Sequence, residues 1–328
     1  MIADILGFLF CGALITFSGI RLSKNGERLA ELTGLSKAWI GLILMATVTS
    51  LPELIAAFSS VIVVNSPDLA AGNILGSCAF NLLILSVLDV MVKKPITSLL
   101  KQSHLVAGSF SIILMVVAGL AILLASSTPA LLWVSPFSPL LIIVYLLAIR
   151  SIFFHDKNQL HNEDKESHNR LLKPKELRHT LTVYGIHAIV VILAALFLPY
   201  FGENIAQETG LSDSFIGTLF LAVTTSLPEL VISIAAVRIG SLDMAMGNLL
   251  GSNVFNILIM SMTDMFYSDG SLYASISIMH LLSILATIMM TAIVAIGLVI
   301  RPEKKIWLLG MDTLVILIIY ILLMVALI

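Results

Sequence analysis

Two glutamates interrupt long apolar stretches of this sequence. Glu53 lies in ATVTSLPELIAAF, residues 46–58, and Glu229 lies in AVTTSLPELVISI, which begins at Ala222. A carboxylate inside a membrane span costs several kcal/mol to bury, so such a residue is functional by default. Two buried carboxylates at close quarters also need a compensating positive charge. One divalent cation, two monovalent cations or two protons would supply it, and competition between such ions is the chemistry of an exchanger.

The residues just before each glutamate add oxygen atoms to this chemistry. Pro52 and Pro228 immediately precede the glutamates, and a proline removes one helix hydrogen bond, so both helices should kink or break. A backbone oxygen freed in this way inside a membrane must be satisfied, and a bound cation is one solution. Thr49 lies four residues before Glu53 and therefore shares its helix face, and Thr225 repeats this spacing in the second stretch.

A second polar stripe follows each glutamate. Amide and hydroxyl side chains recur at every fourth position, which places them on one helix face; they are Asn73, Ser77 and Asn81, then Asn248, Ser252 and Asn256. Glycines at the same spacing allow close helix packing; they are Gly72, Gly76, Gly247 and Gly251. Oxygen and amide groups without a repeated histidine or cysteine favour Na⁺, Ca²⁺ or Mg²⁺ over zinc or copper. Asn73 and Asn248 could equally satisfy backbone groups between helices.

These side chains require a membrane scaffold. The 328 residues are 59% hydrophobic and only 12% charged, with a mean hydropathy of +1.05, which excludes an ordinary soluble domain. Two isolated cysteines provide no disulfide or metal framework. Ten apolar runs approach the roughly 20 residues that a membrane helix needs; they are 2–20, 39–64, 69–92, 104–125, 130–149, 181–201, 214–237, 242–266, 276–300 and 306–328. The predicted fold class is an all-α membrane protein with ten transmembrane helices.

The basic residues predict the orientation. All 18 Lys and Arg residues fall in the connections after the first, third, fifth, seventh and ninth runs. Basic residues collect in cytoplasmic loops, so these connections are predicted to be cytoplasmic and both termini to lie outside. The one sizeable hydrophilic connection, residues 150–180, is predicted to be a cytoplasmic linker loop.

The chain is an internal duplication. The stretches around the two glutamates lie 176 residues apart, and DLAAGNILGSCAFNLLILS from Asp68 returns as DMAMGNLLGSNVFNILIMS from Asp243. Each half holds an odd number of predicted helices, so the second half must enter the membrane inverted. The predicted domains are a first five-helix repeat at 1–149, the linker at 150–180 and an inverted five-helix repeat at 181–328. In such folds the binding site lies near the midplane between the halves.

The paired TSLPEL and GN-x-x-GS-x-x-FN blocks resemble the alpha repeats of the cation/Ca²⁺ exchanger superfamily, specifically its prokaryotic Na⁺/Ca²⁺ exchanger branch. The resemblance implies an antiporter that exchanges Na⁺ for Ca²⁺ by alternating access. It implies Ca²⁺ contacts from Glu53, Glu229 and the backbone carbonyls of Thr49 and Thr225. It also implies Na⁺ contacts from Ser50, Ser77, Ser226 and Ser252 and from the carbonyls of Ala46 and Ala222, with Asn81 and Asn256 in the middle of the cluster.

Asn256 departs from part of that family. K⁺-dependent relatives carry an aspartate at the matching place, so the asparagine argues against K⁺ coupling. The linker at 150–180 also has no room for the large Ca²⁺-sensing loop of eukaryotic relatives, which argues against allosteric Ca²⁺ regulation.

Three function classes follow. A Na⁺/Ca²⁺ antiporter is preferred, and an H⁺/Ca²⁺ or other cation antiporter of the same fold is the alternative, although proton-coupled relatives usually carry Gly-Asn-x-x-Glu in place of Ser-Leu-Pro-Glu. An enzyme would need an asymmetric nucleophile or metal constellation, and a channel would more naturally be a ring of identical subunits. We expect no cofactor besides the transported Ca²⁺ and Na⁺, a prokaryotic plasma (inner) membrane as the location, and neither nucleic acid nor an obligate protein as partner.

Four further aspartates repeat between the halves. Asp68 and Asp243 open their helices and are predicted to be N-caps. Asp89 and Asp264 lie near the far ends of the same helices, and a structural role is favoured over a place along an ion path.

The first helix of each half is the predicted moving gate. Runs 2–20 and 181–201 lack strong polar anchors and carry small residues. Two histidines in apolar runs, His187 and His280, show no repeat partner and are predicted to be packing or interface residues.

Overall fold

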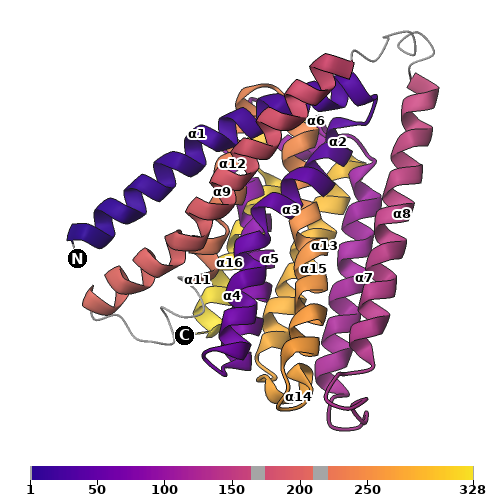
Figure 1. Ribbon diagram of the computed structural model, residues 1–328. Helices are drawn as coiled ribbons and strands as arrows, with labels where there is room; N and C mark the ends of the chain where they lie inside the picture. The colour runs from indigo at the N-terminus through magenta and orange to yellow at the C-terminus, as the bar shows by residue number, and fades with distance from the viewer. Residues whose placement is uncertain (1, 164–173, 210–220, 328) are drawn as a thin grey trace.

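The computed structural model describes residues 2–163, 174–209 and 221–327, which are almost entirely helical (Figure 1). The first half contains a broken second helix, in which a π-helical stretch called η1 joins α2 to α3. Its helices are α1 (Ile2–Thr33), α2 (Lys37–Trp39), η1 (Ile40–Met45), α3 (Ala46–Thr49), α4 (Leu51–Ile62), α5 (Pro67–Val90), α6 (Ile96–Leu99), α7 (His104–Leu123) and α8 (Phe137–Glu163).

The second half follows the same order. Two short antiparallel strands, β1 and β2, precede its last helix. Its elements are α9 (Pro174–Thr209), α11 (Leu221–Thr225), α12 (Leu227–Arg238), α13 (Leu242–Phe266), α14 (Leu272–Ser275), α15 (His280–Ile300), β1 (Lys305–Ile306), β2 (Leu309–Gly310) and α16 (Met311–Leu327).

The helices confirm the predicted all-α membrane fold. Eight helical spans of the described residues are long and apolar enough to cross a membrane, with Lys37–Ile62 counted as one span. The apolar α16, which has 17 residues, occupies the place of the tenth predicted run. The broken pair α11 and α12 occupies the place of the seventh run, whose first residues lie outside the described part of the chain.

The first helix extends beyond its predicted end at residue 20. α1 reaches Thr33, so Arg21, Lys24 and Arg28 lie on the helix and not in a loop. This extension buries one face at helical spacing, formed by Leu22, Gly26, Leu29 and Ala30. An apolar face of this kind stabilises a helix even where the other face is charged.

The predicted linker is also partly helical. α8 continues to Glu163 and α9 begins at Pro174. Residues 164–173 lie outside the described part of the chain, and helices thus occupy both ends of the predicted 150–180 loop.

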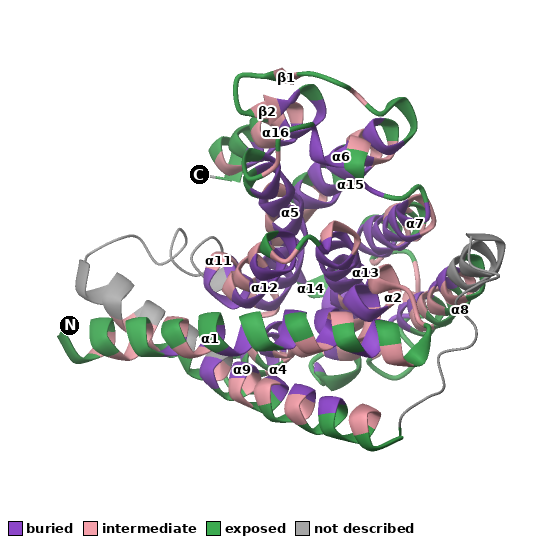
Figure 2. Cartoon of the chain, turned by 90° about the horizontal axis from the view of Figure 1, so that it is seen from above, coloured by how far each residue is buried: buried purple, intermediate pink, exposed green. Residues whose placement is uncertain are grey.

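The third helix of each half forms the centre of the molecule. α5 and α13 are buried along most of their length, whereas α1 exposes much of its surface (Figure 2). α1 and α9 lie side by side along the outside of the bundle (Figures 1 and 2). The halves interlock, because α8 packs against α13, α16 against α5, and α7 against α15.

The duplication extends to the turns before the last helices. A β-bridge joins Leu131 to Val134 before α8, and the β1–β2 pairing joins Ile306 to Leu309 before α16. Each turn contains a residue in the left-handed region with φ of 62°; they are Leu132 and Trp307.

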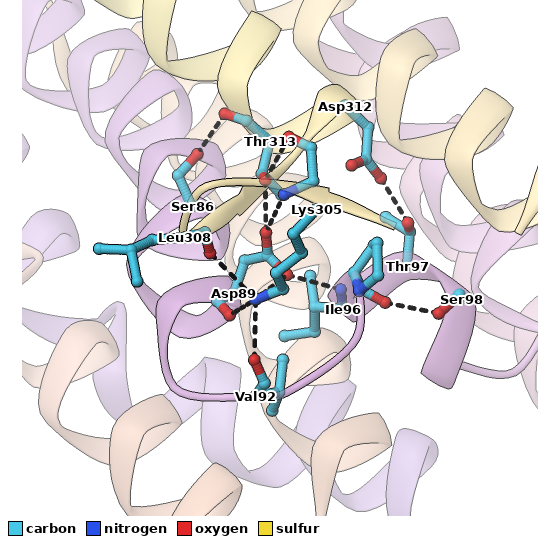
Figure 3. A network of polar contacts seen from close by, with 12 residues as sticks. Ser86, Asp89, Val92, Ile96, Thr97, Ser98, Lys305, Leu308, Asp312 and Thr313 are labelled. Carbon is cyan, nitrogen blue, oxygen red and sulfur yellow. Dashed lines mark hydrogen bonds and ion pairs between the residues drawn. The ribbon is translucent and has the colours of Figure 1, made fainter. Parts of the chain in front are cut away.

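Asp89 is buried in the polar network of Figure 3 at the end of α5. Its carboxylate accepts backbone N–H bonds from Ile96 (2.7 Å) and Gly310 (2.6 Å) and a hydroxyl bond from Thr313 (2.7 Å). The Lys305 ammonium lies 3.2 Å from Asp89 Oδ1. Asp89 therefore ties α5 to the turn around α6 and to the start of α16.

Asp264 makes the matching connection in the second half. It accepts backbone N–H bonds from Leu272 (2.7 Å) and Ser135 (2.8 Å) and a hydroxyl bond from Ser138 (2.6 Å). These donors lie 175 or 176 residues from their counterparts around Asp89. The contacts of both aspartates support the structural role favoured above.

Asp68 and Asp243 do not act as N-caps, so that prediction is wrong. Asp68 Oδ1 lies 3.0 Å from His280 Nε2, and Asp243 Oδ1 lies 3.0 Å from His104 Nε2. Each aspartate also accepts the backbone N–H three residues before its histidine, at 2.6 and 3.0 Å respectively. His280 thus does have a repeat partner, His104, 176 residues earlier. Each aspartate reaches across the bundle to the start of a helix in the other half.

Candidate cation-binding site

Both proline-containing helices break beside the glutamates, as predicted. α3 ends at Thr49 and α4 begins at Leu51, while α11 ends at Thr225 and α12 begins at Leu227. The residue between each pair leaves helical geometry in the same way, with φ/ψ of −90°/4° and −89°/6°. Each proline lies in the first turn of the new helix, where its missing N–H costs little. The break places each glutamate just inside a helix N-terminus.

Each carboxylate accepts a hydrogen bond from a serine of the other half. Ser226 Oγ donates to Glu53 Oε1 at 3.0 Å, and Ser50 Oγ donates to Glu229 Oε1 at 3.2 Å. Ser252 Oγ lies 3.4 Å from the same Glu229 oxygen. Each glutamate is thus held by the serine of the opposite break, and all five side chains are fully buried.

The two threonines hold the polar stripes of the opposite half. Thr225 Oγ1 lies 3.1 Å from Asn73 Oδ1, and Thr49 Oγ1 lies 3.3 Å from Asn248 Oδ1. Both hydroxyls also lie 3.2 Å from the backbone oxygen three residues earlier, on Ala222 and Ala46 respectively. Ser77 Oγ is 3.5 Å from the Ala222 oxygen. The structure therefore brings the predicted glutamates, serines and threonines of both halves into one cluster with Asn73 and Asn248. Asn81 bonds instead to Asn253, and neither polar atom of the Asn256 amide has a hydrogen-bond partner.

Four of these residues retain oxygen atoms without a hydrogen-bond partner. All are buried, and the atoms are Glu53 Oε2, Glu229 Oε2, Asn81 Oδ1 and Asn256 Oδ1; the Nδ2 of Asn256 also has no partner. A buried acceptor without a partner costs about 1–3 kcal/mol, and more when it is charged. No lysine or arginine is among the buried residues that the structure describes. The cluster thus has oxygen atoms in excess and no positive side chain to neutralise its carboxylates.

The donor set suits a hard cation. Within the described residues, no group of three or more His, Cys, Asp or Glu side chains could hold a metal ion. The site instead combines two carboxylates with hydroxyl, amide and backbone oxygens. Ca²⁺ and Na⁺ accept such all-oxygen surroundings, whereas zinc and copper prefer nitrogen or sulfur.

Glycines let α13 approach the first part of the broken helix closely. A Cβ atom on Gly247 would lie 2.3 Å from the Ala38 backbone oxygen, and one on Gly251 would lie 2.4 Å from the Leu42 backbone oxygen. A side chain at either position would therefore clash with the facing backbone. On α5, Gly72 is buried and Gly76 is partly buried, and their packing role stays a prediction.

Two buried residues of the site escaped sequence reasoning. Asn253 accepts a hydrogen bond from Asn81 Nδ2 at 3.0 Å, and Ser233 Oγ accepts one from Asn248 Nδ2 at 3.1 Å. Their repeat counterparts are Cys78 and Ala57. Because neither pair matches, the search for residues shared by both halves passed over them.

Comparison with known proteins decides the family. The sequence model described as "Sodium/calcium exchanger protein" matches residues 3–154 and 179–328, one match for each half. The chain belongs to the sodium/calcium exchanger family. This exchanger is 29% identical over 253 residues to the inner membrane protein YrbG of Escherichia coli, which covers 75% of this chain and 74% of YrbG.

The exchanger is also similar to two further proteins. It is 26% identical over 255 residues to an uncharacterized membrane protein of Methanocaldococcus jannaschii, covering 77% of this chain and 78% of that protein. It is 37% identical over 113 residues to the sodium/calcium exchanger MaX1 of Methanosarcina acetivorans, covering 31% of this chain and 32% of MaX1.

A solved structure shows the same fold. The sodium-calcium exchanger NCX_Mj superposes with a TM-score of 0.74 at 21% sequence identity, covering 98% of both chains. The match to the family model over both halves makes the chain an integral membrane cation/Ca²⁺ antiporter and not an enzyme.

Proposed function

We propose that this exchanger moves Ca²⁺ in one direction and Na⁺ in the other by alternating access around Glu53 and Glu229. The observation that carries the proposal is the pair of fully buried carboxylates, each with an unpartnered Oε2, in a cluster without a basic side chain. One Ca²⁺ or two Na⁺ would neutralise the pair. Ions that compete for the same two charges cannot occupy the site together, and this competition couples their movements.

The proposed Ca²⁺ ligands are the two glutamates and the backbone carbonyls of Thr49 and Thr225. The proposed Na⁺ ligands are Ser50, Ser77, Ser226 and Ser252 with the carbonyls of Ala46 and Ala222. The reciprocal bonds between serines and glutamates support this arrangement, because a serine that leaves a carboxylate to contact an ion also frees that carboxylate.

Sodium is preferred over the proton as the coupling ion. Serine hydroxyls lie on both carboxylates, and they provide Na⁺ ligands in addition to the glutamates and carbonyls proposed for Ca²⁺. The alternative is an H⁺/Ca²⁺ antiporter, because two protons would neutralise the two carboxylates as two Na⁺ would. Asn256 provides an amide where K⁺-dependent relatives carry a carboxylate, which supports exchange without K⁺.

Alternating access is proposed to move α1 and α9 together. The two helices were expected to lack polar anchors, but they bind one another through an ion pair between Arg28 and Glu176 and through Ser18 and His187, 3.3 Å apart. α1 contacts the site-bearing α12 through the Ser23 hydroxyl. Because the pair packs along its length on the outside of the bundle (Figure 2), it can slide without unpacking the central α5 and α13.

The proposed location is a prokaryotic inner membrane, as for the relative named inner membrane protein YrbG. α2 and α6 lie at the same end of the bundle, opposite α14 (Figure 1). Lys37 opens α2, and Lys93 and Lys94 precede α6. Basic residues at that end support a cytoplasmic position for it and for the 150–180 linker, with both termini outside.

Uptake of ⁴⁵Ca²⁺ by proteoliposomes tests the coupling ion. Vesicles containing the purified exchanger are loaded with Na⁺ and diluted into Na⁺-free buffer, and matched vesicles carry only an outward proton gradient. Uptake that needs the Na⁺ gradient and disappears with the Na⁺ ionophore monensin is expected. Uptake driven by the proton gradient alone would refute Na⁺ coupling.

A further inference from the structure

We infer that Asn253 is a positioning residue that fixes which atom Asn81 presents to the transported cation. The inference rests on the proposed function. It makes the two halves of the site unequal, because the position that corresponds to Asn253 in the first half is Cys78.

A backbone carbonyl sets the orientation of both amides. Asn253 Nδ2 donates to the Cys78 backbone oxygen at 3.1 Å. A carbonyl can only accept, so the NH₂ group of Asn253 must face it and the Oδ1 must face away. That Oδ1 lies 3.0 Å from Asn81 Nδ2 and accepts its N–H. The NH₂ group of Asn81 is therefore hydrogen-bonded to α13.

The consequence is a fixed ligand oxygen on α5. With its NH₂ group bound, Asn81 leaves Oδ1 buried and without a partner. Asn81 and Asn253 are both fully buried, which also limits rotation of the amide. An oxygen held in place before the ion arrives binds it more tightly than one that must first turn, because less ordering is needed on binding.

No matching amide pair orients the corresponding asparagine of the second half. Asn256 corresponds to Asn81 in the repeat, and neither its Oδ1 nor its Nδ2 has a hydrogen-bond partner. The residue that would orient it is Cys78, whose sulfur lies 4.0 Å from the Asn253 backbone oxygen. A thiol is a weak donor and cannot orient an amide as a second amide does. No amide partner therefore fixes which atom of Asn256, the oxygen or the NH₂ group, faces the site.

Transport kinetics separate positioning from a merely structural tie between α5 and α13. The test variant is Asn253→Cys, which copies the residue of the corresponding position, and the control is Ser261→Ala. Ser261 is buried on the same helix, and its hydroxyl bonds to the backbone oxygen of Ile257 at 3.1 Å. The KM for Ca²⁺ and the maximal rate are measured by ⁴⁵Ca²⁺ uptake per folded protein, with the gradient that drives the wild type.

We expect Asn253→Cys to raise the KM for Ca²⁺ by roughly 3- to 10-fold, the value of one hydrogen bond. In an Asn81→Ala background the same substitution should change KM by less than about twofold, because the oriented oxygen is already absent. Ser261→Ala should leave KM unchanged.

Two results would overturn the inference alone. One is a lower maximal rate with an unchanged KM in Asn253→Cys, and the other is a rise in KM that persists in the Asn81→Ala background. A wild-type protein that takes up Ca²⁺ under neither gradient would instead overturn the proposed function, and this inference with it.

Discussion

Replacing Glu53 by glutamine tests the site most severely, because the change removes one charge and almost no volume. In the structure, Glu53 Oε1 accepts the Ser226 hydroxyl and Oε2 has no partner. A glutamine oxygen can keep the first contact, so the fold should persist. Loss of one partner from a buried charge pair costs about 3–5 kcal/mol, which lowers the affinity for Ca²⁺ at least about 100-fold.

Two assays measure this loss. At a Ca²⁺ concentration near the wild-type KM, a 100-fold weaker site reduces Na⁺-driven ⁴⁵Ca²⁺ uptake to about 2% of wild type. In thermal unfolding, Ca²⁺ at 100 times the wild-type Kd stabilises the wild type by about 2.7 kcal/mol and the variant by only about 0.4 kcal/mol. The matched control is Glu31→Gln, because Glu31 is an exposed carboxylate paired with Arg28 on α1 and an exposed pair contributes at most about 1 kcal/mol. Wild-type uptake or a full Ca²⁺ stabilisation in Glu53→Gln would refute the assignment.

Three other substitutions test separate parts of the structure. Asn256→Asp should change the charge moved per Ca²⁺ or the pH profile of uptake without abolishing it, and no change in either would argue against a central place for this residue. Gly251→Ala should lower the free energy of unfolding by about 1–3 kcal/mol, because the new Cβ would lie 2.4 Å from the Leu42 backbone oxygen; an unaltered melting temperature in detergent would contradict that contact. Asp89→Ala should cost about 3–5 kcal/mol by removing the carboxylate that pairs with Lys305, whose ammonium would keep only its backbone carbonyl partners. Adding Lys305→Met should recover part of this loss, whereas additive losses would show that the pair is not coupled.

Sequence reasoning predicted the broken helices because proline acts locally. Pro52 and Pro228 remove hydrogen bonds wherever they occur in a helix, so the breaks needed no knowledge of the fold. The polar stripes on α5 and α13 were visible for a similar reason, since helical spacing alone places their residues on one face.

The pairing between halves could not be read from the sequence. Helical spacing associates Glu53 with Thr49, yet its hydroxyl partner in the structure is Ser226 from the opposite break. That contact depends on how the two broken helices face each other, which is a property of the assembled bundle. The Asp68 pairing with His280 was hidden in the same way, because its meaning depends on a contact between helices far apart in sequence.

Asymmetric residues were the hardest to find. Asn253 has a cysteine at its repeat position, so the search for residues shared between halves gave no signal. The length of α1 was also missed, because its basic residues looked like a loop although the opposite face is apolar and buried. The role of Asn253 and the length of α1 both depend on which residues are buried, and the sequence does not record burial.

Equilibrium binding of ⁴⁵Ca²⁺ to the purified exchanger at increasing Na⁺ concentration tests most directly whether the two ions compete for one pair of carboxylates. We predict one bound Ca²⁺ per chain, displaced by Na⁺ with a dependence steeper than first order, and no binding in Glu53→Gln or Glu229→Gln at the same Ca²⁺ concentration. Ca²⁺ binding that Na⁺ leaves unchanged and that only protons displace would contradict the claim.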